Sequence, residues 1–233
     1  MESRKCKVEV FAMKRLIIYI FAALVSITIS AQGQCKFCRS YEDFINDKWE
    51  KIDTIYCKKS KLWGGGYDNE YTLTTGNKAL DKSLKKEAFI VMQSDTAYLN
   101  CHNLRHDNVL LGNGFTRARR FNNNGLIFAR HFANKKSRQE IRTAIFIGGI
   151  NVGLSAASDY DKKQVCYIIS SGADEKGYIN TRMVDDQMIE EMMEKDIIKE
   201  GSLYIEYLSE GKKAKRMNPS HVIPILEKAG LIK

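Results

Sequence analysis

Four apolar runs with alternating polar residues occupy the middle of the chain. AFIVMQ and TAYLNCH are separated by Ser94 and Asp95, and FTRARRF and GLIFARHF are separated by the asparagines at 122–124. Period-two alternation is typical of half-buried strands, and short Asn, Asp and Ser segments favour tight turns. The pattern predicts a four-stranded antiparallel meander. Because Arg117 and Arg119 share one face of FTRARRF, we expect that face to be solvated.

Two further stretches have strand character. YTLTTG is predicted to be a strand, and the glycine cluster WGGGYDN before it is expected to break regular structure. VCYIISSGADEKGYINTRMV predicts a β-hairpin whose loop runs from Gly172 to Gly177 and holds Asp174 and Glu175. The loop lacks the alternating oxygen ligands of a calcium site.

Helical spacing predicts short helices in the first half of the chain. Ser40 is expected to cap a helix whose apolar face runs from Tyr41 to Trp49. NKALDKSLKKE is a basic amphipathic sequence, with Leu80 and Leu84 on the side that we expect to face the core.

The last third of the chain is predicted to be helical. Asp185 caps DQMIEEMMEKDII, whose apolar side runs from Met188 to Ile197 and is interpreted as core. LYIEYLSEG follows as a short helix. HVIPILEKAGLIK closes the chain, with Pro224 expected in the first turn and Gly230 at the helix stop.

One uncharged stretch, TAIFIGGINVGLSAAS at 143–158, allows several interpretations. A capping box at 137–140 predicts a helix over 141–158. Its sixteen uncharged residues fall short of the roughly 20 that a membrane span needs. Gly149, Gly153 and Ala157 share one helix face, so self-association through them is an alternative. We favour a helix buried against the sheet over membrane contact.

These elements together predict an α+β fold. An antiparallel sheet, made of the meander and the hairpin, is packed with the apolar glycine-containing helix and with a helical C-terminal third. No Pro/Ser-rich linker divides residues 32–233, which we therefore interpret as a single domain.

The N-terminus has the pattern of a secretory signal peptide. Lys14 and Arg15 precede the apolar run LIIYIFAALVSITI, which ends at the small residues Ser30 and Ala31. We expect residues 1–31 to be removed and the protein to be periplasmic or extracellular. We also expect Met13 to be the true start, with residues 1–12 not translated.

Charge narrows the classes of partner. The whole chain has a net charge of +9, and removal of residues 1–31 leaves +6. A modest positive charge interspersed with acids is not a nucleic-acid footprint. Membrane lipid or acidic polysaccharide are the anionic partners that this charge would favour.

Five cysteines remain after that cleavage, and an oxidising compartment makes one or two disulfides an expectation. The pairing is open among Cys35, Cys38, Cys57, Cys101 and Cys166. Cys101 and Cys166 lie in strand-like segments, so they form either a pair across the core or two buried free thiols. The C-x-x-C at 35–38 has no preceding strand, which favours a local disulfide or a loose terminal pair over a redox site.

No motif predicts an active site, a cofactor or a metal centre. The candidate nucleophiles are Cys101, Ser170 and Ser171, and no histidine or carboxylate is placed to activate them. We expect Ser171 to be a turn residue. A zinc set would have to join Cys101 and His102 to cysteines over sixty residues away, and these two side chains point to opposite faces of a strand. We predict no catalytic, cofactor-binding or metal-binding residues.

Several stretches resemble an uncharacterised domain-of-unknown-function family of exported proteins from Gram-negative gut bacteria. They are CRSYEDF at 38–44, YLNCHNLR at 98–105, GNGFTRA at 112–118, QVCYIISSGADEKGYI at 164–179 and SHVIPILEKAGLI at 220–232. The resemblance implies export and a single domain from about residue 38 onward. It implies no activity, cofactor or catalytic residue.

Two function classes follow. The first is an exported, non-enzymatic module that binds a protein partner, the envelope surface or a second copy of itself. The alternative is an envelope hydrolase or thiol-dependent enzyme that uses Cys101 or Ser170.

Overall fold

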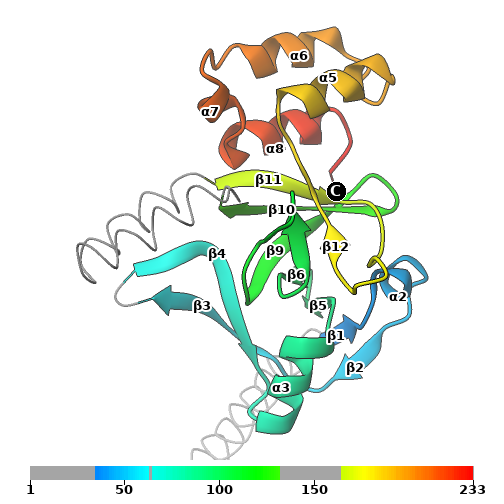
Figure 1. Cartoon of the computed structure of the whole chain (residues 1–233), viewed down its shortest axis with the longest axis vertical. Coiled ribbons are helices and arrows are strands. Elements are labelled where there is room, and N and C mark those ends of the chain that lie inside the picture. Colours follow the sequence, from blue (N-terminus) through cyan, green and yellow to red (C-terminus); the bar gives the residue numbers. More distant parts are fainter. Residues whose placement is uncertain (1–34, 63–64, 132–163, 233) are drawn as a thin grey trace, which may run out of the picture. The chain divides into compact units, whose positions relative to one another are not determined.

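The computed structural model describes residues 35–62, 65–131 and 164–232. Within them, ten strands form one sheet in the order β13-β11-β10-β9-β6-β5-β1-β2, with β3 paired to β4 and β4 paired to β9 (Figure 1). Their bounds are β1 Cys35–Cys38, β2 Glu50–Ile52, β3 Tyr56–Leu62, β4 Gly65–Thr74, β5 Ile90–Gln93, β6 Thr96–Asn100, β9 Phe115–Phe121, β10 Gly125–His131, β11 Gln164–Ile169 and β13 Arg182–Met183. The α+β class is confirmed.

The predicted meander is confirmed as β5-β6-β9-β10, with every neighbouring pair antiparallel. Ser94 and Asn122 adopt left-handed φ values of 52° in the two tight turns, a conformation that Asn tolerates better than most residues. Arg117 and Arg119 are exposed as expected. Phe115 and Phe121 lie on the same face but are buried, because other elements cover both ends of this strand.

The predicted hairpin at 165–184 is only partly correct. β13 returns to β11, with Tyr167 opposite Met183, but β12, Ile179–Asn180, leaves this sheet. β12 instead pairs in parallel with β7, Leu104–His106, in a small sheet that β8, Val109–Leu110, completes. Arg105 explains the departure, since its guanidinium contacts Asn180 and Asp174 and holds this segment against β7.

The β3–β4 pair also differs from the prediction. The glycine cluster was expected to interrupt regular structure, yet Gly65 and Gly66 open strand β4. The register shifts between Lys59 and Lys61, where the hairpin is irregular. Glycine residues can therefore occur at the start of this strand, because glycine adopts the backbone conformations that a β-bulge or similar irregularity requires.

The described helices are α2 Tyr41–Ile45, α3 Lys78–Glu87, α5 Asp186–Glu194, α6 Gly201–Leu208, α7 Lys213–Arg216 and α8 Pro219–Lys228. Ser40 and Asp185 cap α2 and α5 as predicted, accepting bonds from the amides of Asp43 and Met188. Asn77 caps α3, and Leu84 is buried beneath it.

Several details of the helical prediction are wrong. α2 ends at Ile45 and α5 ends at Glu194, so Trp49 and Ile197, which were expected on their apolar faces, lie beyond the two helices. α8 begins at Pro219, with Asn218 as its cap, and this start is five residues before the Pro224 that was expected in the first turn. Pro224 therefore lies inside the helix. Ile197 is 37% exposed, and Ile198 is buried in its place. The short helix α7 had no apolar periodicity to reveal it.

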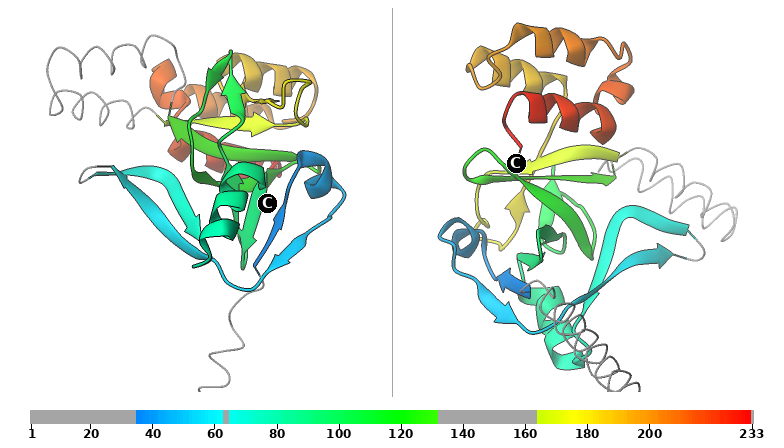
Figure 2. Two further views of the ribbon diagram at one scale, coloured as in Figure 1. Left: turned by 60° about the horizontal axis from the view of Figure 1, so that its bottom comes forward. Right: turned by 180° about the vertical axis from the view of Figure 1, so that it is seen from behind.

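Alternating residues of the sheet enter different cores. Val165, Tyr167 and Ile169 of β11 belong to one cluster with Phe44, Leu99 and Leu104, whereas Cys166 and Ile168 pack with the C-terminal helices on the opposite face. Figures 1 and 2 show α5 to α8 gathered on that side of β10 and β11. A third cluster, around Leu84 and Tyr98, lies beneath α3.

The apolar stretch at 143–158 lies outside the described residues. So do its glycine-spaced face, Gly149, Gly153 and Ala157, and the N-terminal segment at 1–31. Of the helices that the structure does describe, none is long and apolar enough to cross a bilayer.

A candidate ligand pocket

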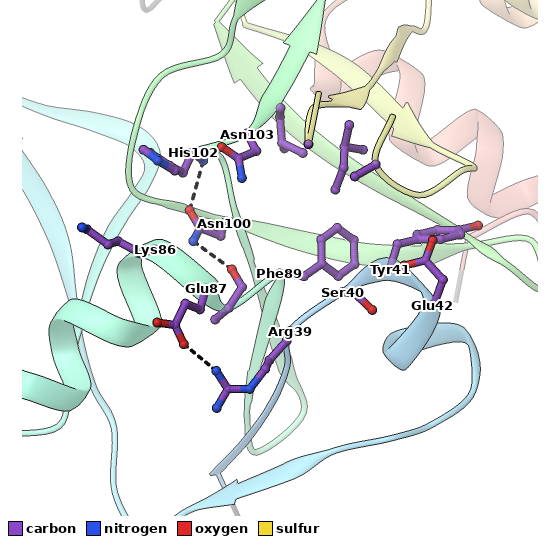
Figure 3. Close-up of a pocket in the computed structure, with 15 residues that line it drawn as sticks. Arg39, Ser40, Tyr41, Glu42, Lys86, Glu87, Phe89, Asn100, His102 and Asn103 are labelled. Atoms are coloured by element: carbon purple, nitrogen blue, oxygen red, sulfur yellow. Dashed lines mark hydrogen bonds and ion pairs between the residues drawn. The ribbon is translucent and has the colours of Figure 1, made fainter. Parts of the chain in front are cut away.

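A pocket of about 120 Å³ opens where α2 begins, α3 ends and β6 leads into β7 (Figure 3). Its floor is apolar, formed by Phe89, Leu104 and Ile179. Its rim is polar, and Figure 3 shows Lys86 and Glu42 at opposite ends with Phe89 between them. The complete lining is Arg39, Ser40, Tyr41, Glu42, Lys86, Glu87, Ala88, Phe89, Asn100, His102, Asn103, Leu104, Ala173, Gly177 and Ile179.

Asn100 holds two walls of this pocket together. Its side-chain amide donates to the carbonyl oxygens of Lys85 and Ala88, at 3.0 and 2.8 Å, at the end of α3. Its Oδ1 accepts from the backbone amide of His102 at 3.0 Å. Asn100 is 6% exposed, so few water molecules can replace these partners. The end of α3 and the turn after β6 are therefore fixed to each other by one side chain.

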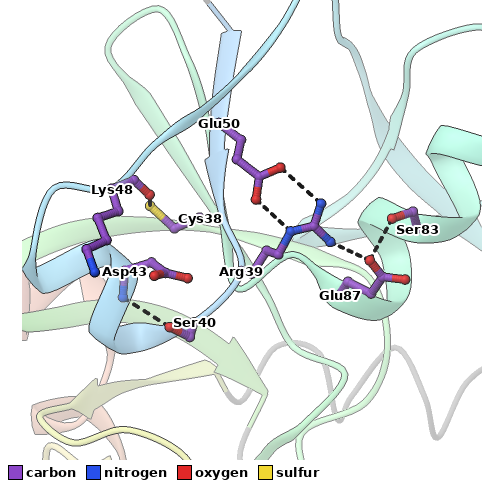
Figure 4. A network of polar contacts seen from close by, with 8 residues as sticks. All are labelled: Cys38, Arg39, Ser40, Asp43, Lys48, Glu50, Ser83 and Glu87. Carbon is purple, nitrogen blue, oxygen red and sulfur yellow. Dashed lines mark hydrogen bonds and ion pairs between the residues drawn. The ribbon is translucent and has the colours of Figure 1, made fainter.

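Arg39 also lines the pocket, and Figure 4 shows its guanidinium between the carboxylates of Glu50 and Glu87. Its Nε donates to Glu50 at 2.6 Å and its Nη1 donates to Glu87 at 2.5 Å. Ser83 also donates to Glu87, and these bonds, that from Ser83 foremost, lower the pKa of the Glu87 carboxyl. Arg39 is thus occupied by two carboxylates and acts as a brace between β1, β2 and α3.

Tyr41 and Gly172 shape the opposite rim. The Tyr41 hydroxyl donates to the Asn124 carbonyl at 2.7 Å, and its ring meets Phe89 edge-on with centroids 6.0 Å apart. A Cβ on Gly172 would lie 1.9 Å from Oε1 of Glu42. Glycine at 172 therefore lets the Glu42 carboxylate stand against the loop at this end of the pocket.

Three polar side chains at the rim have no internal partner. Glu42, Lys86 and Asn103 make no side-chain hydrogen bond or ion pair with any residue in the described ranges. A carboxylate, an ammonium and an amide thus face solvent around an apolar floor. Such an arrangement can bind a small polar ligand, since both charges and a neutral donor–acceptor pair are available.

A second hollow of about 290 Å³ is less suited to a ligand. His106 bonds through Nδ1 to the Thr181 carbonyl, at 3.0 Å, and Asp185 caps α5. Arg182 is paired with Glu191 at 2.8 Å. Most of its polar groups therefore already have partners within the protein.

No disulfide joins any two of the five cysteines in the described residues, so the expected disulfides are not present. Cys101 and Cys166 belong to clusters on opposite faces of the sheet, and a pair across one core is therefore excluded. The remaining reading, two buried free thiols, holds.

The C-x-x-C sequence is strand β1 itself and is not a loose terminal pair. Cys35 packs into the cluster beneath α3, whereas Cys38 packs into the cluster on the other face and donates to the Lys48 carbonyl at 3.3 Å. Three residues along a strand place side chains on opposite faces. Burial, reinforced by nearby Asp43, raises the pKa of Cys38 to about 12.

Neither Cys101 nor Ser170 is activated as a catalytic nucleophile. Cys101 is fully buried, and this burial raises the pKa of its thiol. A buried thiol disfavours the reactive thiolate. Ser170 is exposed, and no hydrogen bond in the described part of the chain joins its hydroxyl to a histidine or a carboxylate.

The histidines do not form a metal site. His102 Nδ1 lies 3.0 Å from Asn113 Oδ1, and His221 Nε2 lies 2.9 Å from the Tyr207 carbonyl. No group of three His, Cys, Asp or Glu side chains that could hold a metal ion occurs among the residues that the structure describes.

Sequence reasoning did not identify the pocket, although a signal for it was present. Three of the stretches that carry the family resemblance, 38–44, 98–105 and 164–179, supply most of the lining. Nothing in the sequence indicated that they meet. Their convergence depends on the parallel pairing of β12 with β7, which the hairpin interpretation did not include.

Comparison with known proteins gives one family match. The model of a family of unknown function (DUF6563) matches residues 36–233. Searches of curated proteins and of solved structures found no match.

Proposed function

Because the chain belongs to this family of unknown function, its role must be inferred from its own side chains, and we propose that it is an exported, non-enzymatic binding protein. Its ligand is a small polar molecule, or the end of a larger one, held in the pocket between α2, α3 and β7. The observation that carries this proposal is the unpartnered set Glu42, Lys86 and Asn103 around an apolar floor.

The pocket also favours binding over catalysis. Phe89 and Leu104 are buried and fixed in the core, so the floor is preformed and little ordering accompanies binding. The nearest titratable ring, that of His102, is held at Nδ1 by Asn113. The lining contains no serine, cysteine or threonine hydroxyl or thiol beside a base: Ser40 accepts the capping bond of α2.

Blocking the pocket tests the proposal. Ala173 is exposed at the rim, so we expect Ala173→Trp to fill the opening without disturbing the core. Amide chemical shifts of the mature protein would be followed by NMR during titration with monosaccharides, amino acids and small carboxylates. Shifts are expected at residues 39–42, 86–89, 100–104 and 173–179, and Ala173→Trp is expected to abolish them.

Glu175→Trp is the matched control, because residue 175 lies in the same exposed loop but does not line the pocket. This variant is expected to retain the shifts. Shifts that cluster elsewhere, or that both tryptophan variants leave unchanged, would contradict the proposal. Equal melting temperatures of the two variants would show that neither result comes from unfolding.

Export is the second part of the proposal, and it is supported by the basic and apolar N-terminal pattern. An origin among Gram-negative gut bacteria belongs to the same proposal and depends on the resemblance. N-terminal sequencing of the protein recovered from the cell envelope or the medium tests whether the protein is exported and where it is cleaved. We expect the product to begin at Gln32, whereas a product that still begins with MKRLII, or that stays in the cytoplasm, would refute export.

A further inference from the structure

We infer that the ligand is an acidic polysaccharide whose chain continues from the pocket along one face of α3; this inference rests on the proposed binding function. The surface concerned is the lysine row, defined as Lys78, Lys82, Lys85 and Lys86. All four are exposed. Lys86 also lines the pocket, so the row leads directly into it.

The spacing of the row places its members on one side of the helix. Intervals of four, three and one residues keep the four ammonium groups within about 100° of arc at 3.6 residues per turn. Leu80 and Leu84 lie on the opposite side, where Leu84 is buried against the core. The apolar side thus anchors the helix and leaves the lysine row facing solvent.

Neither acid of the helix forms an ion pair with the row. Asp81 accepts from the Thr74 hydroxyl and the Thr75 amide, both at 2.6 Å, and these bonds lower the pKa of its carboxyl. Glu87 is bonded to Arg39 and Ser83. Within the described residues, none of the four lysines forms an ion pair. The positive charge of the row is therefore available to an external anion.

Helix stability does not account for the whole row. Lys85 and Lys86 in the last turn interact favourably with the helix dipole. Lys78, at the first helical position, opposes the dipole, where an acidic residue would be favoured. A lysine at that end costs stability, which indicates that the row as a whole serves another role.

The form of the surface favours a polysaccharide over a lipid surface. The row is narrow and roughly 12 Å long at the ~1.5 Å rise per residue of an α-helix, and it ends in a concave pocket with an amide and an aromatic rim. A helix that binds at a bilayer surface presents apolar side chains to it. In the described residues the large exposed apolar side chains are Tyr56, Leu110, Ile197, Ile205 and Leu208, and none of these is on α3.

Two linear polyanions test the inference: polygalacturonate, with carboxylates, and chondroitin sulfate, with carboxylates and sulfates. Binding of the mature protein would be measured by biolayer interferometry at low and physiological salt. We expect at least one polyanion to bind, more weakly as salt increases. The fourfold change Lys78→Gln, Lys82→Gln, Lys85→Gln and Lys86→Gln is expected to weaken binding about tenfold or more, because several charge contacts are lost together.

The control removes the same charge elsewhere, from four exposed lysines on and between the C-terminal helices: Lys199→Gln, Lys212→Gln, Lys213→Gln and Lys215→Gln. This variant is expected to bind nearly as well as the wild type. An equal loss in both variants would reduce the effect to net charge and overturn the inference. So would binding to neutral dextran, or binding to phosphatidylglycerol vesicles with no binding to either polyanion.

Ala173→Trp separates this inference from the function on which it rests. If the wild type ignores both polyanions while Ala173→Trp still abolishes the small-ligand shifts, the pocket is retained and the polysaccharide is rejected. If polyanions bind the lysine row and Ala173→Trp does not weaken their binding, the part of the inference that the polysaccharide continues into the pocket is rejected. Weakening by both the fourfold row variant and Ala173→Trp supports the inference.

Discussion

Replacing Arg130 with methionine is expected to lower the free energy of unfolding by about 3–4 kcal/mol, because breaking a buried ion pair from one side costs ~3–5 kcal/mol. Arg130 is 4% exposed on β10. Its Nη2 contacts Glu70 at 3.2 Å and the Asn113 carbonyl at 2.9 Å, and its Nε donates to the Leu111 carbonyl at 3.3 Å. Methionine fills much of the same space but leaves these acceptors unsatisfied.

The Arg130→Met substitution is also expected to affect the loop at 111–114. Gly112 and Gly114 have φ values of 102° and 89°, a conformation that side-chain-bearing residues rarely adopt. The carbonyls that Arg130 binds are in this loop, and Asn113 in turn contacts His102 at the pocket. Loss of Arg130 is therefore expected to loosen the His102 wall as well as the sheet.

Urea denaturation followed by circular dichroism measures the effect. Arg182→Met is the matched control, since Arg182 is also on a strand and paired with a glutamate, but its side chain is 56% exposed. Its expected loss is about 0.2–1 kcal/mol, as for other exposed ion pairs. Equal losses in the two variants would show that burial of Arg130 is not the source of its contribution.

Asn100→Ala is the second large effect, with an expected loss of about 2–3 kcal/mol, since buried polar groups left without partners cost ~1–3 kcal/mol. The substitution removes the donor to the Lys85 and Ala88 carbonyls and the acceptor for the His102 amide. These groups lie on both walls of the pocket. The variant is therefore expected to let the end of α3 move relative to the turn after β6.

Asn103→Ala provides the comparison, because Asn103 lines the same pocket but is exposed. Its expected change in stability is within about 0.5 kcal/mol, as for most surface substitutions. Hydrogen exchange would locate the effect: faster exchange at the last turn of α3 is expected in Asn100→Ala and not in Asn103→Ala. Unchanged exchange at that turn would mean that Asn100 does not fix α3.

The candidate site shows where reasoning from sequence stops. Ser40 could be recognised as a cap, because its partner is the amide three residues away. Asn100 lies within the predicted strand TAYLNCH and was not singled out, because its partners at 85 and 88 are fixed only when α3 packs beside β6. Glu42 and Lys86, the charged residues without partners at the rim, could not be recognised from the sequence. A surface charge can act as a binding group only where the fold places it beside a pocket.

The cysteines also show the difference between what the sequence predicts and what the tertiary structure decides. Alternation along β1 and β11 predicts which residues share a face of the sheet. It does not predict which other elements pack on each face. The open pairing of Cys101 with Cys166 was decided by the C-terminal helices, which cover one face of β11, while β6 and β7 bring Cys101 to the core on the other.

By itself, the sequence determined the meander, the caps at Ser40 and Asp185 and the turn at Gly230, because each depends on residues only a few positions apart. Only the tertiary structure decided the parallel pairing of β12 with β7, the burial of Arg130 and the existence of the pocket. Arg105 and Asp174, whose contact holds β12 in place, are 69 residues apart. No local preference encodes such a pairing, since it is favourable only after the chain between them has folded.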